Sequence, residues 1–144
     1  MPAPVPLPTE PPAAAQAPED LQRVSDAVTA TWQQIDAALA PVIGARGVAA
    51  LFKRSLFLAA PSHAWLDLAQ EGVRPALDLT ELRGALARQS AAEAAAGSAL
   101  LLATFATLLA SLIGASLTER LLRPVSAAAP APLFSDLPPA APPP

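Results

Sequence analysis

The sequence predicts an all-α protein: a compact bundle of four main helices, with a short fifth, between two disordered Pro/Ala-rich tails. Of its 18 prolines, 15 lie in residues 1–18 and 124–144, so the intervening residues are the part that can fold. Within that part, apolar residues recur at spacings of three and four, the period of one helix face. An uncharged stretch of 25 residues, Ala94–Thr118, is long enough to form a central helix.

Composition limits the chain to one domain, residues 19–123, and excludes several kinds of site. About 100 residues can bury a single hydrophobic core. The chain has no cysteine, which excludes disulfides, thiol catalysis and thiolate metal ligands. Its net charge of −3 and the lack of a basic patch interleaved with aromatics argue against nucleic-acid binding. No secretory signal is recognisable near the N-terminus, so we expect a cytoplasmic protein.

The first predicted helix covers residues 19–40. Glu19 and Asp20 lie in its first turn, where the helix dipole favours negative charge. Its apolar face is formed by residues at helical spacing: Leu21, Val24, Val28, Trp32, Ile35 and Leu39. Pro41 is expected to end this helix, because the residue before a proline avoids helical dihedral angles.

A tight turn over residues 41–47 is predicted to lead into a second helix over residues 47–60. The buried face of this helix comprises Val48, Leu51, Phe52, Leu56 and Ala59. On the opposite side lie Arg46, Lys53 and Phe57. Phe57 therefore either packs beneath another helix or the following loop, or is an exposed anchor for a partner, since aromatic and arginine side chains are enriched in binding hot spots.

The next segment contains the short fifth helix, at residues 62–70, and then a loop. Asp78 and Glu81 have the spacing of a capping box, which predicts that a third helix begins at Asp78. Ser90 and Glu93 repeat this spacing, so a fourth helix is expected to begin at Ser90 rather than continue the third.

The fourth predicted helix covers residues 90–123 and contains the uncharged stretch. Its large apolar residues fall on one broad stripe: Leu101, Leu102, Phe105, Leu108, Leu109, Leu112 and Ile113. Small residues, most of them polar, form the opposite side: Thr104, Thr107, Ser111, Gly114 and Thr118. This segregation favours a helix half-buried in a soluble bundle. A membrane span is the alternative, since about 20 apolar residues cross a bilayer and small residues also line contacts between membrane helices.

Two groups near the C-terminus are further candidates for partner binding. The first projects from the same side as the apolar stripe, so it is solvent-exposed or paired across an interface; it comprises Glu119, Arg120 and Arg123. The second is an apolar island in the C-terminal tail that can dock in a groove as a short linear motif; it comprises Leu133, Phe134 and Leu137.

The sequence pattern does not assemble an active site. His63, the single histidine, lies in a predicted turn, where a surface or capping role is expected rather than phosphotransfer. No acidic or histidine cluster has the spacing of metal ligands. Ser55 lacks the surroundings of a catalytic serine, and Asp26 and Asp36 are scattered surface charges. We therefore predict a protein without catalytic residues, cofactor or metal.

These observations predict a non-catalytic interaction or regulatory module. We expect it to bind a protein partner, or a second copy of itself, through the fourth helix and the outer side of the second. The alternative is a membrane-associated protein in which Ala94–Thr118 is a single spanning or interfacial helix.

Overall fold

The computed structural model describes residues 12–68 and 74–128, and over these residues the chain is helical, without strands. The α-helices are α1 (Pro12–Ile43), α2 (Ala45–Ala59), α3 (Thr80–Leu86), α4 (Ala91–Ile113) and α5 (Ala115–Ala128), and a 3-10 helix, η1, covers Ala64–Leu66. The all-α fold is therefore confirmed. The short helix expected at residues 62–70 is only the three-residue η1.

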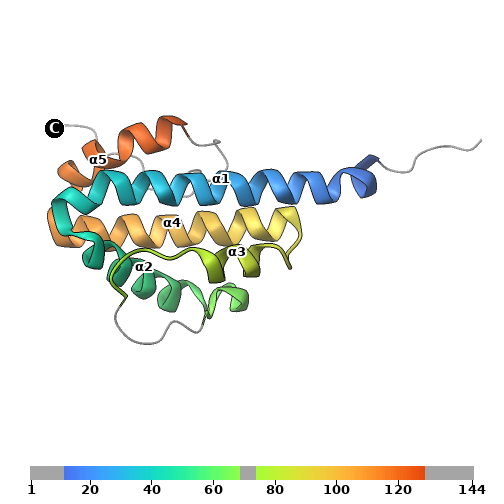
Figure 1. The fold of residues 1–144 in the computed structure, drawn as a ribbon, viewed down its shortest axis with the longest axis horizontal. Helices are drawn as coiled ribbons and strands as arrows, with labels where there is room; N and C mark the ends of the chain where they lie inside the picture. Colours follow the sequence, from blue (N-terminus) through green and yellow to red (C-terminus); the bar gives the residue numbers. More distant parts are fainter. Residues whose placement is uncertain (1–11, 69–73, 129–144) are drawn as a thin grey trace, which may run out of the picture.

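The four longer helices form two hairpins that pack together (Figure 1). α1 and α4 lie side by side and run in the same direction, and each is followed by a helix that turns back from the same end of the bundle. α2 contacts both α1 and α4, and α5 likewise contacts both. α1 and α4 together form the centre of the bundle, because they pack against each other and each contacts both α2 and α5.

A cluster of three aromatic rings fills the centre of the bundle. The ring centroid of Trp32 lies 4.9 Å from that of Phe52 and 5.0 Å from that of Phe105, both in edge-to-face geometry. Each such pair contributes about 1 kcal/mol beyond the burial of its apolar area. Because the rings come from α1, α2 and α4, this cluster holds three helices in a fixed register.

The predicted apolar faces are the ones that the bundle buries, with one exception. The fully buried members are Val28, Trp32, Ile35, Leu39, Val48, Phe52, Leu56, Ala59, Leu101, Leu102, Phe105 and Leu109. The half-buried members are Leu21, Val24, Leu51, Leu108 and Ile113. The exception is Leu112, which was predicted to be part of the buried stripe but is 63% exposed, in the last turn of α4.

Both hairpins turn at a single glycine with a positive φ angle. Gly44 joins α1 to α2 at φ 85° and ψ 154°, and Gly114 joins α4 to α5 at φ 94° and ψ 150°. In each turn the glycine N–H donates to the carbonyl four residues earlier, and the glycine carbonyl accepts from the N–H four residues later. This region of backbone conformation is essentially restricted to glycine, so both turns require that residue.

The two turns share a sequence pattern that repeats after 70 residues. Residues 40–45 read Ala-Pro-Val-Ile-Gly-Ala, and residues 110–115 read Ala-Ser-Leu-Ile-Gly-Ala. Core residues at corresponding positions are also buried, as in the pairs Leu39 and Leu109, Val48 and Thr118, and Phe52 and Leu122. The bundle is therefore an assembly of two similar helical hairpins.

The break at Gly114 corrects the prediction of one continuous helix over residues 90–123. The apolar pattern continues across Gly114, but the positive φ angle there ends α4 and turns α5 back over α1 (Figure 1). Pro41 also differs from its prediction, because it lies inside α1 rather than ending it. The missing proline N–H removes one helical hydrogen bond, and α1 ends only two residues later, at Ile43.

The ends of the helical region extend beyond the predicted boundaries of 19 and 123. α1 begins at Pro12, within the predicted N-terminal tail, and α5 continues to Ala128, within the predicted C-terminal tail. Pro18 and Pro124 lie inside these two helices. The remaining residues of the predicted disordered tails, 1–11 and 129–144, lie outside the described residues.

The helix starts were predicted with mixed success. Ser90 precedes α4 as predicted, since its Oγ accepts a hydrogen bond from the Glu93 N–H at 3.1 Å. The Glu93 side chain does not return to Ser90, because its carboxylate is bound elsewhere. α3 begins later than expected: Leu79 is the residue before the helix, while Asp78 Oδ1 accepts from the Thr80 N–H at 2.9 Å.

Candidate functional site

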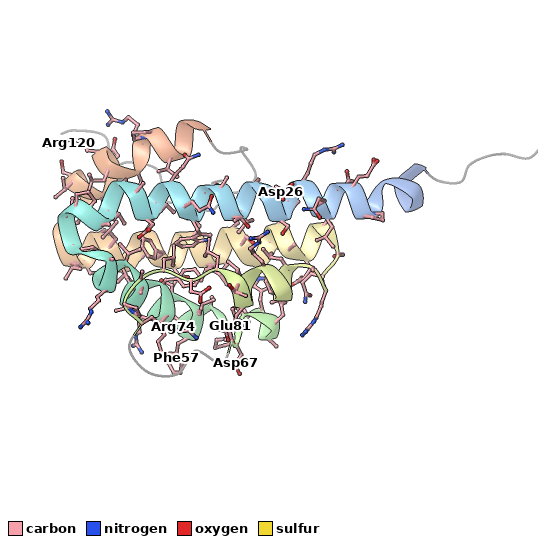
Figure 2. The ribbon with its side chains drawn as sticks, in the orientation of Figure 1. Asp26, Phe57, Asp67, Arg74, Glu81 and Arg120 are labelled. Carbon is pink, nitrogen blue, oxygen red and sulfur yellow. The ribbon has the colours of Figure 1, made fainter. Side chains whose placement is uncertain are left out.

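The outer face of α2 carries three of the predicted binding residues, Arg46, Lys53 and Phe57, and all three are exposed. Phe57 is 67% exposed, and the guanidinium carbon of Arg54 lies 5.3 Å from its ring centroid. Leu58, beside it, is 41% exposed. A cation above an aromatic ring contributes about 0.5–1 kcal/mol at an exposed site, so Arg54 positions the ring without burying it. Figure 2 shows Phe57 at the outer edge of the bundle.

The exposure of Phe57 bears on the two alternatives predicted for it. With 67% of its surface open, the ring does not pack beneath another described helix, and its role as an anchor stays a prediction. Arg54 was not among the predicted residues. Its position three residues before Phe57 on the same helix is the signal that would have identified it, because side chains at this spacing are neighbours.

The predicted charged group Glu119, Arg120 and Arg123 lies on α5, and all three residues are exposed. Glu119 Oε1 accepts a hydrogen bond from Arg123 Nη2 at 2.7 Å. An exposed ion pair at this spacing contributes only about 0.3–0.5 kcal/mol. Because the chain turns at Gly114, these residues belong to a different helix from the apolar stripe, and the prediction that both share one side of one helix is wrong.

The predicted linear motif lies outside the described residues; it comprises Leu133, Phe134 and Leu137. Its docking therefore stays a prediction from the sequence.

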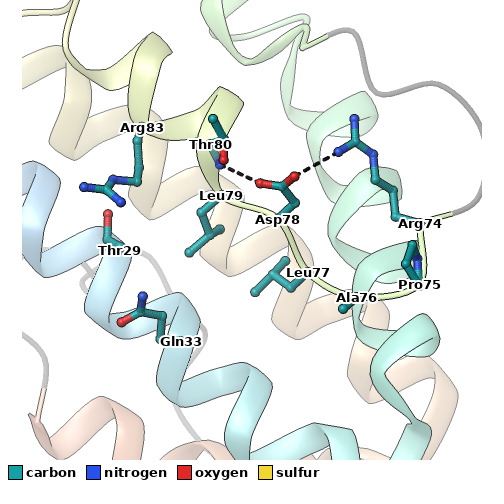
Figure 3. A pocket seen from close by; sticks show the side chains of 10 residues that line it. All are labelled: Thr29, Gln33, Arg74, Pro75, Ala76, Leu77, Asp78, Leu79, Thr80 and Arg83. Atoms are coloured by element: carbon teal, nitrogen blue, oxygen red, sulfur yellow. Dashed lines mark hydrogen bonds and ion pairs between the residues drawn. The ribbon is translucent and has the colours of Figure 1, made fainter.

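A surface pocket of about 480 Å³ lies between α1 and residues 74–83 (Figure 3). Its polar lining comprises Thr29, Gln33, Arg74, Asp78, Thr80 and Arg83. Arg74 bridges two carboxylates, at 3.2 Å from Asp78 Oδ2 and 3.0 Å from Glu81 Oε1. Hydrogen bonds from Thr80 hold the pKa of Asp78 below its usual value, with Arg74 a smaller cause. These charges satisfy one another within residues 74–81, which favours a structural role in fixing the conformation of this segment.

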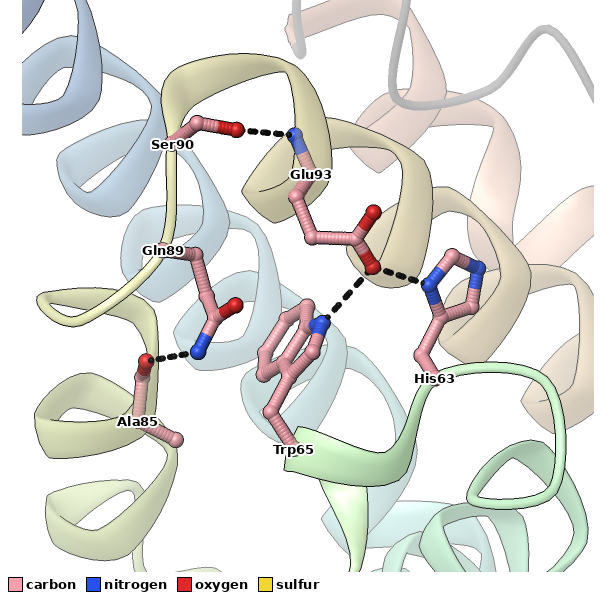
Figure 4. A network of polar contacts seen from close by, with 6 residues as sticks. All are labelled: His63, Trp65, Ala85, Gln89, Ser90 and Glu93. Atoms are coloured by element: carbon pink, nitrogen blue, oxygen red, sulfur yellow. Dashed lines mark hydrogen bonds and ion pairs between the residues drawn. The ribbon is translucent and has the colours of Figure 1, made fainter.

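A polar network joins η1 to the first turn of α4 (Figure 4). Glu93 Oε2 accepts hydrogen bonds from Trp65 Nε1, at 2.9 Å, and from His63 Nδ1. The Trp65 bond is the larger cause, and the His63 bond the second, of a lowered pKa for Glu93. The Trp65 ring lies against Gly97, where an added Cβ would be 2.3 Å from ring carbon Cζ2. Glycine at this position therefore lets the indole pack directly on the α4 backbone.

The network gives the single histidine a structural role. His63 is half-buried and ties the turn after α2 to α4; it precedes η1, but its side chain makes no capping hydrogen bond there. Its pairing with Glu93, 30 residues away, has no signal in the sequence. In residues 12–68 and 74–128, no group of three or more His, Asp, Glu or Cys residues is placed to hold a metal ion.

α4 is the one described helix that is long and apolar enough to cross a membrane. In its most apolar window, 44% of the residues are buried inside the bundle. Its contacts with α1, α2 and α5 favour the interpretation of α4 as a core helix over that of a membrane span.

No protein-family model, curated protein or solved structure matches this chain. Function is therefore inferred from the surfaces of the molecule itself.

Proposed function

We propose that this chain is a non-catalytic, cytoplasmic interaction module that binds a partner protein through the outer face of α2. The observation that carries the proposal is the 67% exposure of Phe57, with Arg54 over its ring. α4 contributes less to the proposed binding surface than expected from the sequence, because most of its apolar stripe faces the core.

Phe57 is a strong candidate for the central residue of an interface. Fully burying a phenylalanine side chain is worth about 1.5–3 kcal/mol. The contact with Arg54 already restricts the ring, which lowers the entropy lost when a partner immobilises it. Truncation of a hot-spot residue typically costs about 2 kcal/mol or more of binding free energy.

The charges around Phe57 indicate what the partner presents. α2 contains Arg46, Lys53 and Arg54 and no Asp or Glu. The complementary surface is an apolar pocket for Phe57 and Leu58 bordered by carboxylates, since complementary charge steers and orients association. A second copy of the chain meets this description in part, because its 12 Asp and Glu residues exceed its 9 Lys and Arg residues.

Site-specific photo-crosslinking in cells that express the full chain tests this surface. A photoreactive amino acid in place of Leu58 should give one discrete adduct, and Phe57→Ala should abolish it. The matched control is the same amino acid in place of Gln34, an exposed residue of α1, which should give no such adduct. Equal adducts at both positions, or an adduct indifferent to Phe57→Ala, would place the partner contact elsewhere.

Light scattering during size-exclusion chromatography separates a second copy from a different protein. A dimer that Phe57→Ala converts to a monomer would identify the partner as another copy of the chain. If the wild type is a monomer, the partner of the α2 face is a different protein. Phe57→Ala should melt like the wild type, because it removes an exposed side chain.

A membrane-associated protein is the second candidate, favoured by the length and apolarity of α4. In that case Ala94–Thr118 is a single spanning or interfacial helix, and the bundle has to open so that core residues such as Phe105 meet lipid. Resistance of the membrane-bound chain to carbonate extraction would support this function. Full recovery without detergent would remove it.

A further inference from the structure

The end of the bundle where both hairpins turn is an apolar tip. Val42 is 45% exposed, Leu112 63% and Leu117 36%. Val42 and Leu112 occupy equivalent places, because each lies two residues before a turn glycine. Figure 1 shows both turns at the same end of the molecule. The glycine-turn tip is defined here by Val42, Ile43, Gly44, Leu112, Ile113, Gly114 and Leu117.

The tip projects outward. A Cβ atom added at Gly44 or Gly114 would meet no other atom within 4 Å, so the backbone of both turns faces open space. The exposed side chains flank these turns. These side chains can therefore insert into a deformable surface layer that offers no preformed pocket for them.

The segments that flank the tip carry a surplus of positive charge. Residues 34–60 and 105–125 contain five Lys or Arg and two Asp or Glu, a net charge of +3. The other described residues contain four Arg and seven Asp or Glu, a net charge of −3. Arg46 and Arg120 are exposed close to the two turns, while Glu119 is already paired with Arg123. Figure 2 shows Arg120 at the tip end and Asp26 away from it.

We propose that the glycine-turn tip is a peripheral contact with an anionic lipid surface. Val42, Leu112 and Leu117 enter the headgroup region, and Arg46 and Arg120 meet lipid phosphates. Aliphatic groups beside cations are what this region of a bilayer favours. α4 stays inside the bundle, so the contact differs from a spanning helix. The tip shares Arg46 with the α2 face, but its contact with lipid does not depend on Phe57 binding a partner.

The size and chemistry of the tip favour lipid over a protein partner. Three exposed aliphatic side chains are far fewer than the roughly 20–30 residues that each protein contributes to a standard interface. The tip also lacks the aromatic residues that dominate hot spots. Binding to a lipid surface needs no matching shape, since it scales with inserted apolar area and attraction to anionic lipids.

The absence of cysteine from the chain makes a direct test simple. Leu112→Cys in the full chain, labelled with an environment-sensitive fluorophore, is mixed with vesicles of phosphatidylglycerol and phosphatidylcholine. Its emission should shift to the blue and gain intensity, much less so with phosphatidylcholine alone, and high salt should reverse the change. The matched control is labelled Ala96→Cys, an exposed residue near the other end of α4, whose spectrum should not change.

The role of the arginines is tested by vesicle affinity. Arg46→Gln and Arg120→Gln should each weaken binding about fivefold, as expected for one cation at an anionic surface. Arg88→Gln, which removes an exposed arginine outside the flanking segments, should leave the affinity unchanged.

Three outcomes would overturn the proposal. The first is the same spectrum at residues 112 and 96, or an affinity indifferent to both arginine substitutions. The second is a blue shift at residue 112 without vesicles together with a doubled mass in light scattering, which would assign the tip to a second copy. The third is vesicle binding that resists high salt and carbonate, which would assign the interaction to a spanning helix.

Discussion

Gly114 has a backbone conformation that other residues cannot adopt without strain. At φ 94° and ψ 150° a side chain costs about 1–3 kcal/mol. Gly114→Ala should therefore lower the free energy of unfolding by about that amount, measured by urea denaturation. Gly84→Ala is the matched control, because Gly84 lies within α3 and its Cβ would meet no atom within 4 Å. We expect it to raise stability by up to about 1 kcal/mol, and equal effects at both sites would contradict the role of the turn.

Thr118 buries a hydroxyl whose Oγ1 has no hydrogen-bond partner among the described residues. The corresponding position of the first hairpin is the buried Val48, which has the same shape without the hydroxyl. Thr118→Val should raise the free energy of unfolding by about 1 kcal/mol, because it removes the cost of burying an unpaired polar group. Thr104→Val is the control, since Thr104 Oγ1 donates to the Leu100 carbonyl at 2.8 Å. A loss of stability in Thr118→Val would show that the hydroxyl has a partner, such as a buried water.

Residue burial was largely predictable because it follows from spacing alone. Trp32, Phe52 and Phe105 were each placed on the correct helix face by their apolar neighbours three and four residues away. Side-chain pairings between distant elements were not predictable. Glu93 had the spacing of a capping box, but its carboxylate binds His63 and Trp65, because the turn after α2 is folded against α4. Only the tertiary arrangement places these donors.

Among the elements, the main error was to miss the break between α4 and α5. It arose because the helix was predicted from apolar periodicity alone. Apolar periodicity passes through Gly114, so it predicts a continuous helix, whereas a glycine after an apolar run is also a signal for a helix end. The repeat of Ile-Gly-Ala at residues 43–45 and 113–115 would have identified two equivalent turns. For Pro41 the error was the opposite, because a helix end was predicted where the helix continues. A proline near a helix end is tolerated.

The contact between η1 and α4 should make stability depend on pH. Hydrogen bonds from Trp65 and His63 lower the pKa of Glu93 from its usual value of 4.5. The folded state therefore favours the carboxylate, and this contribution is present above pH 4.5 and is lost as the pH falls through the lowered pKa. Glu93→Gln should destabilise the protein at neutral pH, and its difference from the wild type should shrink in acid.

Urea midpoints measured from neutral pH into acid check this prediction. Glu19→Gln, which changes an exposed glutamate of α1, is the matched control and should follow the wild type at every pH. A constant difference between Glu93→Gln and the wild type would mean that the carboxylate charge is not what stabilises the contact.

For the molecule as a whole, the sequence predicted the fold class and the outward side of α2 better than the arrangement of the helices. The outer side of α2 followed from the helical spacing of its residues, and Arg46, Lys53 and Phe57 are exposed, which for Phe57 was one of two predicted alternatives. The glycine-turn tip was not predicted, because Val42 and Leu112 come together only when two separate hairpins turn at the same end. A site made by one element can be predicted from its sequence, whereas a site shared by two requires their packing.

The position of α4 within the whole molecule can be tested by two substitutions three residues apart. Leu109 is 0% exposed and Leu112 is 63% exposed, although both lie on the apolar stripe predicted from the sequence. Leu109→Asp puts an unpaired charge into the core, which costs several kcal/mol against a total stability of about 5–15 kcal/mol, so the bundle should unfold. Leu112→Asp should fold, and its thermal melt in detergent-free buffer should match the wild type. If α4 crossed a membrane, both charges would lie within the same apolar run. The amount of protein recovered in the membrane fraction would then fall to a similar degree for both variants.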